Sequence, residues 1–529
     1  MRLRALPLVG LVFLLGAPGA ANAAKTAKAP EKTPPPPVTL AVPEGVKPED
    51  HAKVFAEYET QMASGQKSRA ADALVTILEN PAQAAYHGEA NAILGDILAQ
   101  LDLKYGALLA YERAFSLAGP IDTTLIGTRV PKAIELANAV GDMAVLEEPF
   151  SKNVGLAQTD DVRGQMAFLA AREAVRTESY GLALGVLKMV RPGDPLYPDA
   201  RSLEGIAMNQ QGRPEDALTP LLDAQKTARS KDQRFLDMLW LNLGRSYYAT
   251  GNFAKAIQSY AAVSRGSDFW PQAQFERSWA HFRINDMNGS LGLLMSLDTP
   301  FFTDYYYPEA DLLRIYSMFM MCKFPEANNA IEAFKSHYKS VHESLKGWSG
   351  KSESDNFEAA RKYRETGDTS GLPALLWRPF SVEDRFGASI AAVKAADEEL
   401  TRMKNAAANP FTERARTAVM ARRNQLVRNE GGRIKARLQY QQDELNDMLT
   451  NSELFTIDIL RMKTLLYEQA AAIGRMPDVA TTVKREERAR KGWREWPFEG
   501  EIWADEIGYY RVSAAPECPA GLRQAADGN

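Results

Sequence analysis

The residue types that most often carry catalysis or bind metals are scarce in this sequence. Among its 529 residues are 5 histidines and 2 cysteines, types from which enzymes draw many bases, nucleophiles and zinc ligands. His337 and His342 lie five residues apart, a spacing that does not place two ligands on one helical face. No phosphate-binding glycine loop, zinc-ligand spacing or nucleophile motif occurs. We therefore expect a protein without catalytic activity, metal ion or other cofactor.

One dipeptide suggests acid catalysis, namely Glu343 followed by Ser344. It superficially resembles the catalytic acid of the soluble lytic transglycosylases, a family that also carries a helical superhelix in the periplasm. The Gly-Leu-Met-Gln-like segment expected downstream in that family is missing, and long helices are predicted instead of a lysozyme-like domain. A lytic transglycosylase-like enzyme is therefore a remote alternative.

Two further sets of residues could serve binding or cross-linking. Cys322 and Cys518 could form one disulfide if the protein is exported, tying the C-terminal segment to the preceding helices; the alternative is a buried thiol and a free one. Residues 411–437 hold eight basic side chains against Glu413 and Glu430, a pattern suited to an anionic partner or simply to a solvated helix face. The basic residues are Arg414, Arg416, Arg422, Arg423, Arg428, Arg433, Lys435 and Arg437.

The elements that must position these residues are predicted by a repeated pattern of residue sizes. In three stretches a glycine is followed 12 residues later by an alanine, and further residues of the pattern follow that alanine at +4 and +7. These spacings keep the residues on one helical face, where small ones let two antiparallel helices cross closely beside a large one. The copies are Gly95, Ala107, Tyr111 and Ala114; Gly205, Ala217, Leu221 and Ala224; and Gly244, Ala256, Tyr260 and Val263.

The third copy resembles the tetratricopeptide repeat family, because Trp240 begins a Trp-x-x-Leu-Gly-x-x-Tyr motif. The distance from Ala183 to Ala217 is also 34 residues, the period of that family. The resemblance predicts an all-α fold in which seven to eight helix pairs over residues 51–340 form a right-handed superhelix. It also implies a partner-binding groove, and counting from the glycines places six residues there. These are Arg172, Arg176, Asn209, Gln210, Arg245 and Tyr248; a solvated helix face is the alternative.

The sequence changes character after the repeats. Residues 341–382 contain loop-like stretches and predict a linker, and residues 383–474 show a 3–4 alternation of apolar residues that predicts long coiled-coil-like helices. A break in that pattern is expected at Asn451 and Ser452. Residues 475–529 form a segment rich in tryptophan and tyrosine, including Trp493, Trp496 and Trp503, which predicts a packed tail. The tail and the general layout resemble envelope tetratricopeptide proteins of delta-proteobacteria, some of which belong to gliding-motility machinery.

The N-terminus predicts export. Residues 1–23 combine Arg2 and Arg4, a short apolar run, and an Ala-Asn-Ala site for cleavage after Ala23, the features of a secretory signal peptide. No cysteine stands near that site, so a lipoprotein anchor is not expected, and no later segment is apolar enough to span a membrane. Residues 24–50 contain prolines 34–37 and predict an extended linker.

These features together predict a non-enzymatic periplasmic scaffold. With 45% hydrophobic and 25% charged residues and a net charge of -4, the chain resembles an ordinary globular protein and not a nucleic-acid-binding one. The expected partners are proteins of a cell-envelope complex, such as a motility machine, bound in the repeat groove. The long helices could also support an oligomer. The alternative is an envelope adaptor that binds peptidoglycan or an anionic membrane surface through the basic helix.

Overall fold

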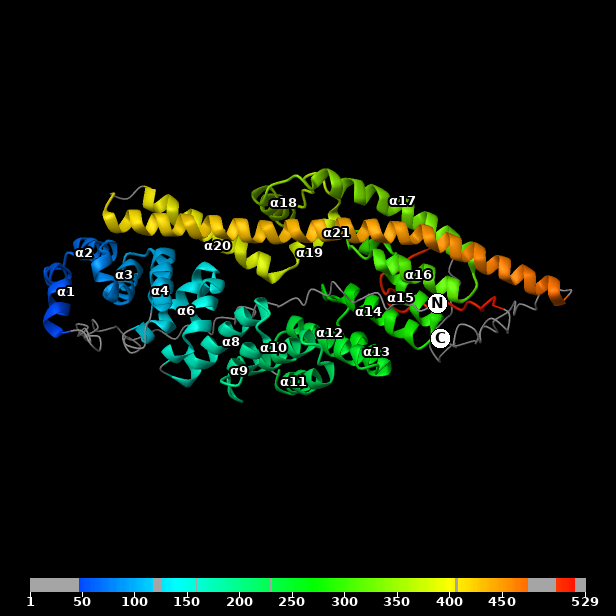
Figure 1. Ribbon diagram of the computed structural model, residues 1–529, viewed down its shortest axis with the longest axis horizontal. Helices are drawn as coiled ribbons and strands as arrows, with labels where there is room; N and C mark the ends of the chain where they lie inside the picture. Colours follow the sequence, from blue (N-terminus) through cyan, green and yellow to red (C-terminus); the bar gives the residue numbers. More distant parts are fainter. Residues whose placement is uncertain are drawn as a thin grey trace. The chain divides into compact units, whose positions relative to one another are not determined.

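The computed structural model describes residues 47–117, 126–157, 159–228, 231–404, 408–473 and 501–518. Within these residues the chain forms helices and no strand (Figure 1). The all-α fold class, with stacked helix pairs followed by long helices, is confirmed. The expected signal peptide, most of the proline-rich linker, and Trp493 and Trp496 lie outside the described residues.

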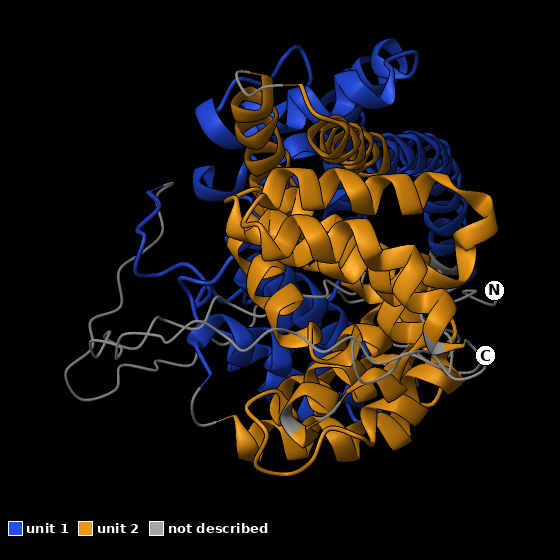
Figure 2. Cartoon of the chain, turned by 90° about the vertical axis from the view of Figure 1, so that its left-hand side faces the viewer, with its two compact units in different colours: residues 1–14, 231–383, 431–529 blue, residues 15–230, 384–430 orange. Residues whose placement is uncertain are grey.

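The chain divides into two compact units (Figure 2). Of the described residues, 231–383, 431–473 and 501–518 belong to unit 1, and those between 47 and 228 together with 384–430 belong to unit 2. Each unit therefore combines helix pairs with residues from the C-terminal part of the chain.

Unit 2 contains five helix pairs in the described part of the chain. The pairs are α1 (Pro48–Ala63) with α2 (Lys67–Glu79), α3 (His87–Gln100) with α4 (Lys104–Leu117), α6 (Val130–Val140) with α7 (Glu147–Lys152), α8 (Asp160–Arg176) with α9 (Tyr180–Leu187), and α10 (Tyr197–Gln210) with α11 (Pro214–Thr227). In four of these pairs the second helix packs against the first, whereas the short α7 packs mainly on α8, and α6 packs on α4 and on the 3-10 turn that precedes α7. The 3-10 turns are η1 (Pro81–Tyr86), η2 (Met143–Leu146) and η3 (Val154–Leu156).

Unit 1 contains three further pairs and two further helices before the long ones. The pairs are α12 (Gln233–Ala249) with α13 (Phe253–Ala261), α14 (Trp270–Arg283) with α15 (Met287–Leu297), and α16 (Pro308–Met320) with α17 (Phe324–Trp348). The remaining elements before the long helices are η4 (Pro300–Phe302), α18 (Glu353–Thr366) and α19 (Ala374–Ser381). Residues 341–382, expected to be a linker, are thus largely helical, and Trp377 and Phe380 of α19 are buried.

The close helix crossings predicted from the repeat pattern are present. A Cβ added to Gly244 would lie 2.5 Å from the ring of Tyr260, and one added to Gly205 would lie 2.5 Å from Leu221. Such distances are below van der Waals contact, so these positions accept only glycine without a shift of the neighbouring helix. The prediction that small residues allow the crossing and large ones fill it is confirmed.

Each of the eight described pairs has one residue with a positive φ in the turn between its helices. Glycine occupies this left-handed position in four turns, where the absence of a Cβ removes the steric cost. The other four turns hold a residue with a side chain, at φ values of 56–61°. The eight residues are Gly65, Asp102, Gly141, Glu178, Gly212, Gly251, Asn285 and Cys322.

Two long helices follow the pairs, α20 (Asp384–Lys404) and α21 (Pro410–Ile473). The break expected at Asn451 and Ser452 is wrong, because α21 continues through them for 64 residues. The Ser452 hydroxyl donates to the carbonyl of Leu449 at 2.6 Å, so the side chain is satisfied within the helix. Met448 and Ile459 are buried on either side. Packing therefore overrides the weak local preference of these residues to leave a helix.

Both long helices complete the cores of the units. In unit 2, one continuous apolar cluster joins the first helix pairs to Ala396 and Met403 of α20 and to Phe411 and Val419 of α21. In unit 1, Phe455 of α21 packs against Tyr316 of α16, with ring centroids 4.3 Å apart. The long helices, expected as a coiled-coil-like module, therefore pack on the helix pairs.

Candidate partner-binding surfaces

Two arginines expected in the groove are bound to carboxylates of neighbouring helices. The Arg245 guanidinium contacts Glu276 of α14 at 2.7 Å, with both side chains largely buried. Arg172 contacts Glu147 of α7 at 3.1 Å, and burial raises the pKa of that glutamate. Each pair links one helix pair to the next, and removing one partner would leave a buried charge uncompensated. The structure thus gives Arg172 and Arg245 a bracing role.

The other four predicted groove residues differ in exposure. Arg176 is half-exposed and forms a bidentate contact with Glu173 of the same helix, and Tyr248 packs edge-on against Phe253, their centroids 5.2 Å apart. Asn209 is partly buried and Gln210 is exposed, both at the end of α10. Arg176 and Gln210 are therefore the exposed residues of the predicted groove set.

The predicted basic stretch of α21 is largely engaged within the protein. Four of its eight cations form ion pairs, Arg416 with Glu413, Arg422 with Asp142, Arg423 with Asp397, and Arg433 with Glu383. Arg414 is half-buried, Lys435 and Arg437 are partly buried, and Arg428 is exposed. Because charge that is already paired binds a second anion weakly, the stretch is a poorer anionic-ligand surface than its composition suggested.

The pair of Arg422 and Asp142 fixes α21 on the turn of the third helix pair in unit 2. Two guanidinium nitrogens each lie 2.8 Å from an oxygen of Asp142, whose side chain is 1% exposed. The same carboxylate accepts the hydroxyl of Tyr105 at 2.7 Å, and burial raises the pKa of that phenol. A buried, bidentate charge pair with a further hydrogen bond is specific in geometry. Asp142 and Arg422 lie 280 positions apart in the sequence, so no local sequence pattern could have predicted that they form a pair.

Glu399 fixes α20 in the same way on the second pair. Its two carboxylate oxygens accept the backbone N–H groups of Tyr105 and Gly106, each at 2.8 Å. These amides belong to the first turn of α4, where N–H groups lack partners within the helix and favour negative charge. Sequence reasoning missed this contact; the available signal was a glutamate between the apolar residues Ala396 and Met403.

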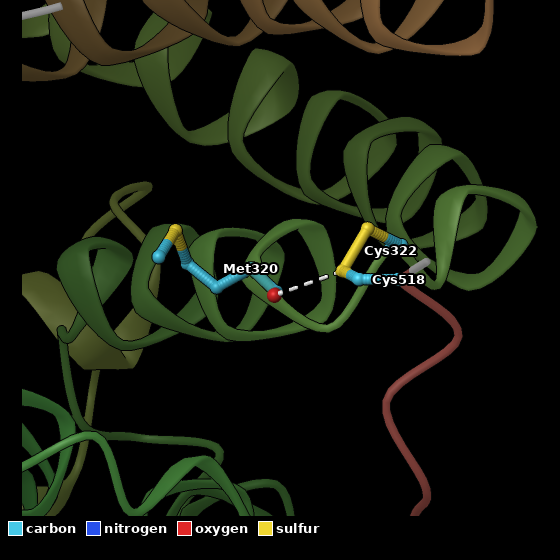
Figure 3. Close-up of a disulfide and its surroundings, with 3 residues drawn as sticks. All are labelled: Met320, Cys322 and Cys518. Carbon is cyan, nitrogen blue, oxygen red and sulfur yellow. Dashed lines mark hydrogen bonds between the residues drawn. A yellow bond between two sulfur atoms is a disulfide. The ribbon is translucent and has the colours of Figure 1, made fainter. Parts of the chain in front are cut away.

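The C-terminal segment 501–518 packs along unit 1 and ends at a disulfide. Cys518 is bonded to Cys322, with Cα atoms 5.1 Å apart, and its Sγ lies 3.5 Å from the Met320 carbonyl oxygen (Figure 3). Next to it, the backbone N–H of Glu517 donates to Met321 at 2.8 Å and its carboxylate contacts Lys323 at 2.7 Å. The tail is thus attached at the turn between α16 and α17.

Only some of the tail's aromatic residues are packed as expected. Gly508 lies against the Trp270 ring, so closely that a Cβ would be 2.6 Å away, and Ile507 is buried. Trp503 and Tyr509 are largely exposed. The attachment of the tail depends more on its backbone and on Ile507 than on these two rings.

An exposed apolar surface on α9, the α9 patch, was not predicted. It consists of Gly181, Leu182 and Gly185, which fall on one side of the helix by their spacing, and of Met189 in the turn that follows α9. Leu182 is 47% exposed and Met189 is 42% exposed, and a Cβ at either glycine would meet nothing within 4 Å. A helix surface with two glycines lets another backbone approach closely, and methionine adapts to varied partners.

A second exposed apolar surface, the α21 stripe, follows the last turns of α21. Its members are Leu454, Ile457, Leu460, Leu465 and Tyr467, of which the first three are 54%, 55% and 58% exposed. Figure 1 shows this end of the helix in orange; at Phe455 it contacts α16 of the same unit. The sequence pattern predicted an apolar stripe here, and the structure leaves it uncovered by the described residues.

The remaining candidate is the dipeptide Glu343–Ser344 in α17. Glu343 is exposed in α17, and Ser344 donates to the carbonyl of Ser340 one turn earlier. In the described part of the chain, no group of three or more His, Cys, Asp or Glu residues is placed to hold a metal ion. Among the same residues, none of the helices combines the length and apolar character that a membrane span requires.

Comparisons with known proteins give weak likenesses only. No family model and no curated protein matches the sequence. A structure of Naa15/Naa10 bound to HypK-THB aligns with 80% of this chain and 63% of that one, at 12% identity and a TM-score of 0.32. The P58(IPK) TPR domain aligns at 13% identity, 77% and 99% coverage and a TM-score of 0.18. Cut9 of the Cut9–Hcn1 assembly aligns at 11% identity, 75% and 89% coverage and a TM-score of 0.22. The chain spans less than two thirds of the first of these, and the fold assignment rests on the helix pairs themselves.

Proposed function

We propose that this protein is a non-enzymatic scaffold of the bacterial periplasm that binds other proteins of the cell envelope. The observation that carries the proposal is the α9 patch, an apolar surface on a stack of helix pairs whose charged side chains are mostly engaged with one another. Contiguous exposed apolar surface on a soluble protein marks interaction sites. Gln210, on the helix that follows α9, adds an exposed amide that could bind partner backbone.

The proposed compartment rests on two independent features. Residues 1–23 have the composition of a secretory signal peptide, and the pairing of Cys322 with Cys518 suits an oxidising environment. A role in a motility complex rests on the resemblance of the tail and layout to envelope proteins of that kind. Fractionation of cells with tagged full-length protein tests the compartment. Recovery of the uncleaved protein in the cytoplasm would contradict it.

Partner capture by matched variants tests the binding surface. Full-length protein with Met189→Glu is compared with Met420→Glu, which alters an equally accessible methionine of α21, 50% exposed, in the same unit. After cross-linking in cells and purification, we expect Met189→Glu to lose at least one envelope protein that the wild type and Met420→Glu retain. Identical sets of partners for the two variants would overturn the assignment of the α9 patch.

The adaptor alternative can be tested separately. Because four cations of the basic stretch are paired with carboxylates, we expect little sedimentation of the protein with peptidoglycan or anionic vesicles at low salt. Strong, salt-sensitive sedimentation that Arg428→Gln reduces would favour the adaptor. Release of cell-wall fragments that Glu343→Gln abolishes would instead favour an enzyme.

A further inference from the structure

The α21 stripe cannot be buried by rotation of its own helix. Phe455, on another side of α21, contacts Tyr316 and Phe319 of α16, with ring centroids 4.3 Å and 5.8 Å away. Ile459, one turn further, is fully buried. Because these anchors lie between the stripe residues in sequence, turning Leu454 and Ile457 inward would expose Phe455 and Ile459. The exposed side is therefore fixed by packing on the opposite side.

The residues around Ile457 are arranged so that the helix complements a reversed copy of itself. Glu453 and Arg461 lie four residues before and after Ile457, and Leu454 and Leu460 lie three before and after. When two such helices run antiparallel and meet at Ile457, each Leu454 faces a Leu460. Each Glu453 then faces an Arg461, and Ile457 faces its own copy. Such self-complementary contacts are the requirement for a two-fold symmetric interface.

The charged residues beside the stripe are available for this pairing. Arg461 is 77% exposed, and its ion pair with Asp458 is long, at 3.8 Å. Glu453 is exposed. Across this segment both signs of charge occur, with Glu453, Asp458 and Glu468 against Arg461 and Lys463. Mixed signs suit an antiparallel copy of the same helix, whereas an anionic membrane would require an excess of cations.

We infer that the α21 stripe is the dimer interface of this protein, on which the α21 stripe of a second copy docks antiparallel with the two-fold axis at Ile457. The occupant is thus a second copy of this chain. Ile457 lies at the centre of the interface, two symmetric pairs of Glu453 with Arg461 lie before and after it along the helix, and Leu454 and Leu460 lie on either side. Leu465 and Tyr467 extend the apolar surface beyond the central contacts. The inference does not depend on the partner proposed for the α9 patch.

Charge reversal tests the pairing without altering the apolar surface. Glu453→Arg alone places arginine opposite arginine twice in the dimer, and Arg461→Glu alone places glutamate opposite glutamate twice. Since like charges facing each other are unfavourable, we expect each single variant to dimerise roughly tenfold or more weakly in sedimentation at low salt. The double variant Glu453→Arg/Arg461→Glu restores the opposite signs, so its dimerisation should return to near the wild-type level.

Cysteine cross-linking tests the register. The 2 cysteines of the sequence are both in the disulfide, so an introduced cysteine provides the single free thiol. Ile457→Cys should form a disulfide-linked dimer on mild oxidation, because each copy faces itself at the axis. Leu454→Cys should not cross-link to itself, but should cross-link when mixed with Leu460→Cys. Asn451→Cys, an exposed position on another side of the helix, is the control.

The possible outcomes distinguish a second copy of this chain from any other partner of the α21 stripe. A monomer at all accessible concentrations, or single charge variants that dimerise like the wild type, would overturn the inference. Self-cross-linking of Leu454→Cys would indicate a parallel arrangement and would also overturn it. Retained binding to vesicles or to another protein through the stripe, without dimerisation, would identify a different occupant. Loss of dimerisation with retained partner capture would leave the proposed scaffold function intact, so the two proposals can fail separately.

Discussion

Glu178 occupies a backbone conformation that suits glycine. It has φ of 57° in the turn between α8 and α9, and its side chain is exposed. A side chain in this left-handed region costs roughly 1 kcal/mol because the Cβ approaches the following carbonyl. In four of the eight described pairs the equivalent residue is glycine, so the other four turns carry a small, local conformational cost.

We predict that Glu178→Gly raises the free energy of unfolding of unit 2 by about 1 kcal/mol, since it removes this steric conflict. Urea unfolding followed by circular dichroism measures the change. Glu178→Ala is the control, because it deletes the same carboxylate but keeps the Cβ. Equal stability of the two variants would show that the turn is not strained.

A second prediction at the residue scale concerns pH. Burial in α16, with further contributions from Glu444 and Glu276 that Arg437 only partly offsets, raises the pKa of Glu309 from 4.5 to about 7. The folded protein then binds a proton that the unfolded chain has lost between about pH 4.5 and pH 7. The free energy of unfolding of unit 1 should therefore fall as the pH rises through this window, by on the order of 3 kcal/mol for this group.

Glu309→Gln should remove that pH dependence. We expect it to stabilise unit 1 at about pH 8 and to leave it nearly unchanged at about pH 5, where the wild-type carboxyl group is already protonated. Urea unfolding at both pH values measures the difference. The exposed Glu343→Gln in α17 is the control, and a Glu309→Gln variant with the wild-type pH dependence would contradict the assignment.

At the scale of elements, the contact between α18 and α21 depends on one glycine. A Cβ at Gly431 would lie 1.9 Å from the carbonyl oxygen of Glu353, whereas a Cβ at the adjacent Gly432 would lie 3.6 Å from its nearest neighbour, the Glu353 carboxylate. Two glycines within a long helix are otherwise unfavourable by about 1 kcal/mol each relative to alanine. Gly431 is required because the backbone of α18 crosses at this point, whereas Gly432 is not required by any such contact.

We predict opposite effects for the two neighbouring substitutions. Gly431→Ala should destabilise unit 1 by about 1–3 kcal/mol or more, because the backbone of α18 cannot move as a flexible side chain would. Gly432→Ala should stabilise it by up to about 1 kcal/mol through helix propensity. Thermal unfolding of both proteins gives the comparison. If both alanines stabilise the protein, α18 does not cross α21 at Gly431.

Contacts between helices that are close in the sequence could be predicted, and contacts between distant helices could not. Gly205 and Gly244 could be assigned to helix crossings because the partners Leu221 and Tyr260 follow at fixed short distances. Glu399 and Arg422 could not be assigned, since their partners lie hundreds of positions away and their burial depends on tertiary packing. The failed break at Ser452 has the same origin, because a hydrogen bond to Leu449 and buried neighbours outweigh local preference.

At the scale of the molecule, neither unit is a continuous segment. The chain passes from one unit to the other near residues 230, 383 and 430, and the last passage lies inside α21. Removing the residues after 381 would take Val419 and Met403 from the core of unit 2 as well as the tail from unit 1. Point substitutions in the full chain are therefore the appropriate tests of binding, and sequence composition alone could not show this interleaving.

The disulfide is predicted to hold the tail on unit 1. In Cys322→Ser/Cys518→Ser we expect residues 501–518 to be cleaved faster in limited proteolysis and unit 1 to lose about 2–5 kcal/mol, because the link restricts a long loop in the unfolded chain. Thiol titration of the wild type without reductant should find no free thiol. Two free thiols, or unchanged cleavage of the double variant, would contradict a structural disulfide.

The position of that bond also determines which parts of the chain would bear a mechanical load. The covalent loop from Cys322 to Cys518, separated by 196 residues, contains α17, α18, α19, α20 and α21. Tension applied beyond Cys518 would pass through the sulfur atoms to the turn after α16 and then along the helix pairs toward the N-terminus. The covalent path of that tension would bypass the long helices and the α21 stripe on them. The proposed scaffold would then transmit a pull at its C-terminal end without a covalent path through its proposed dimer interface.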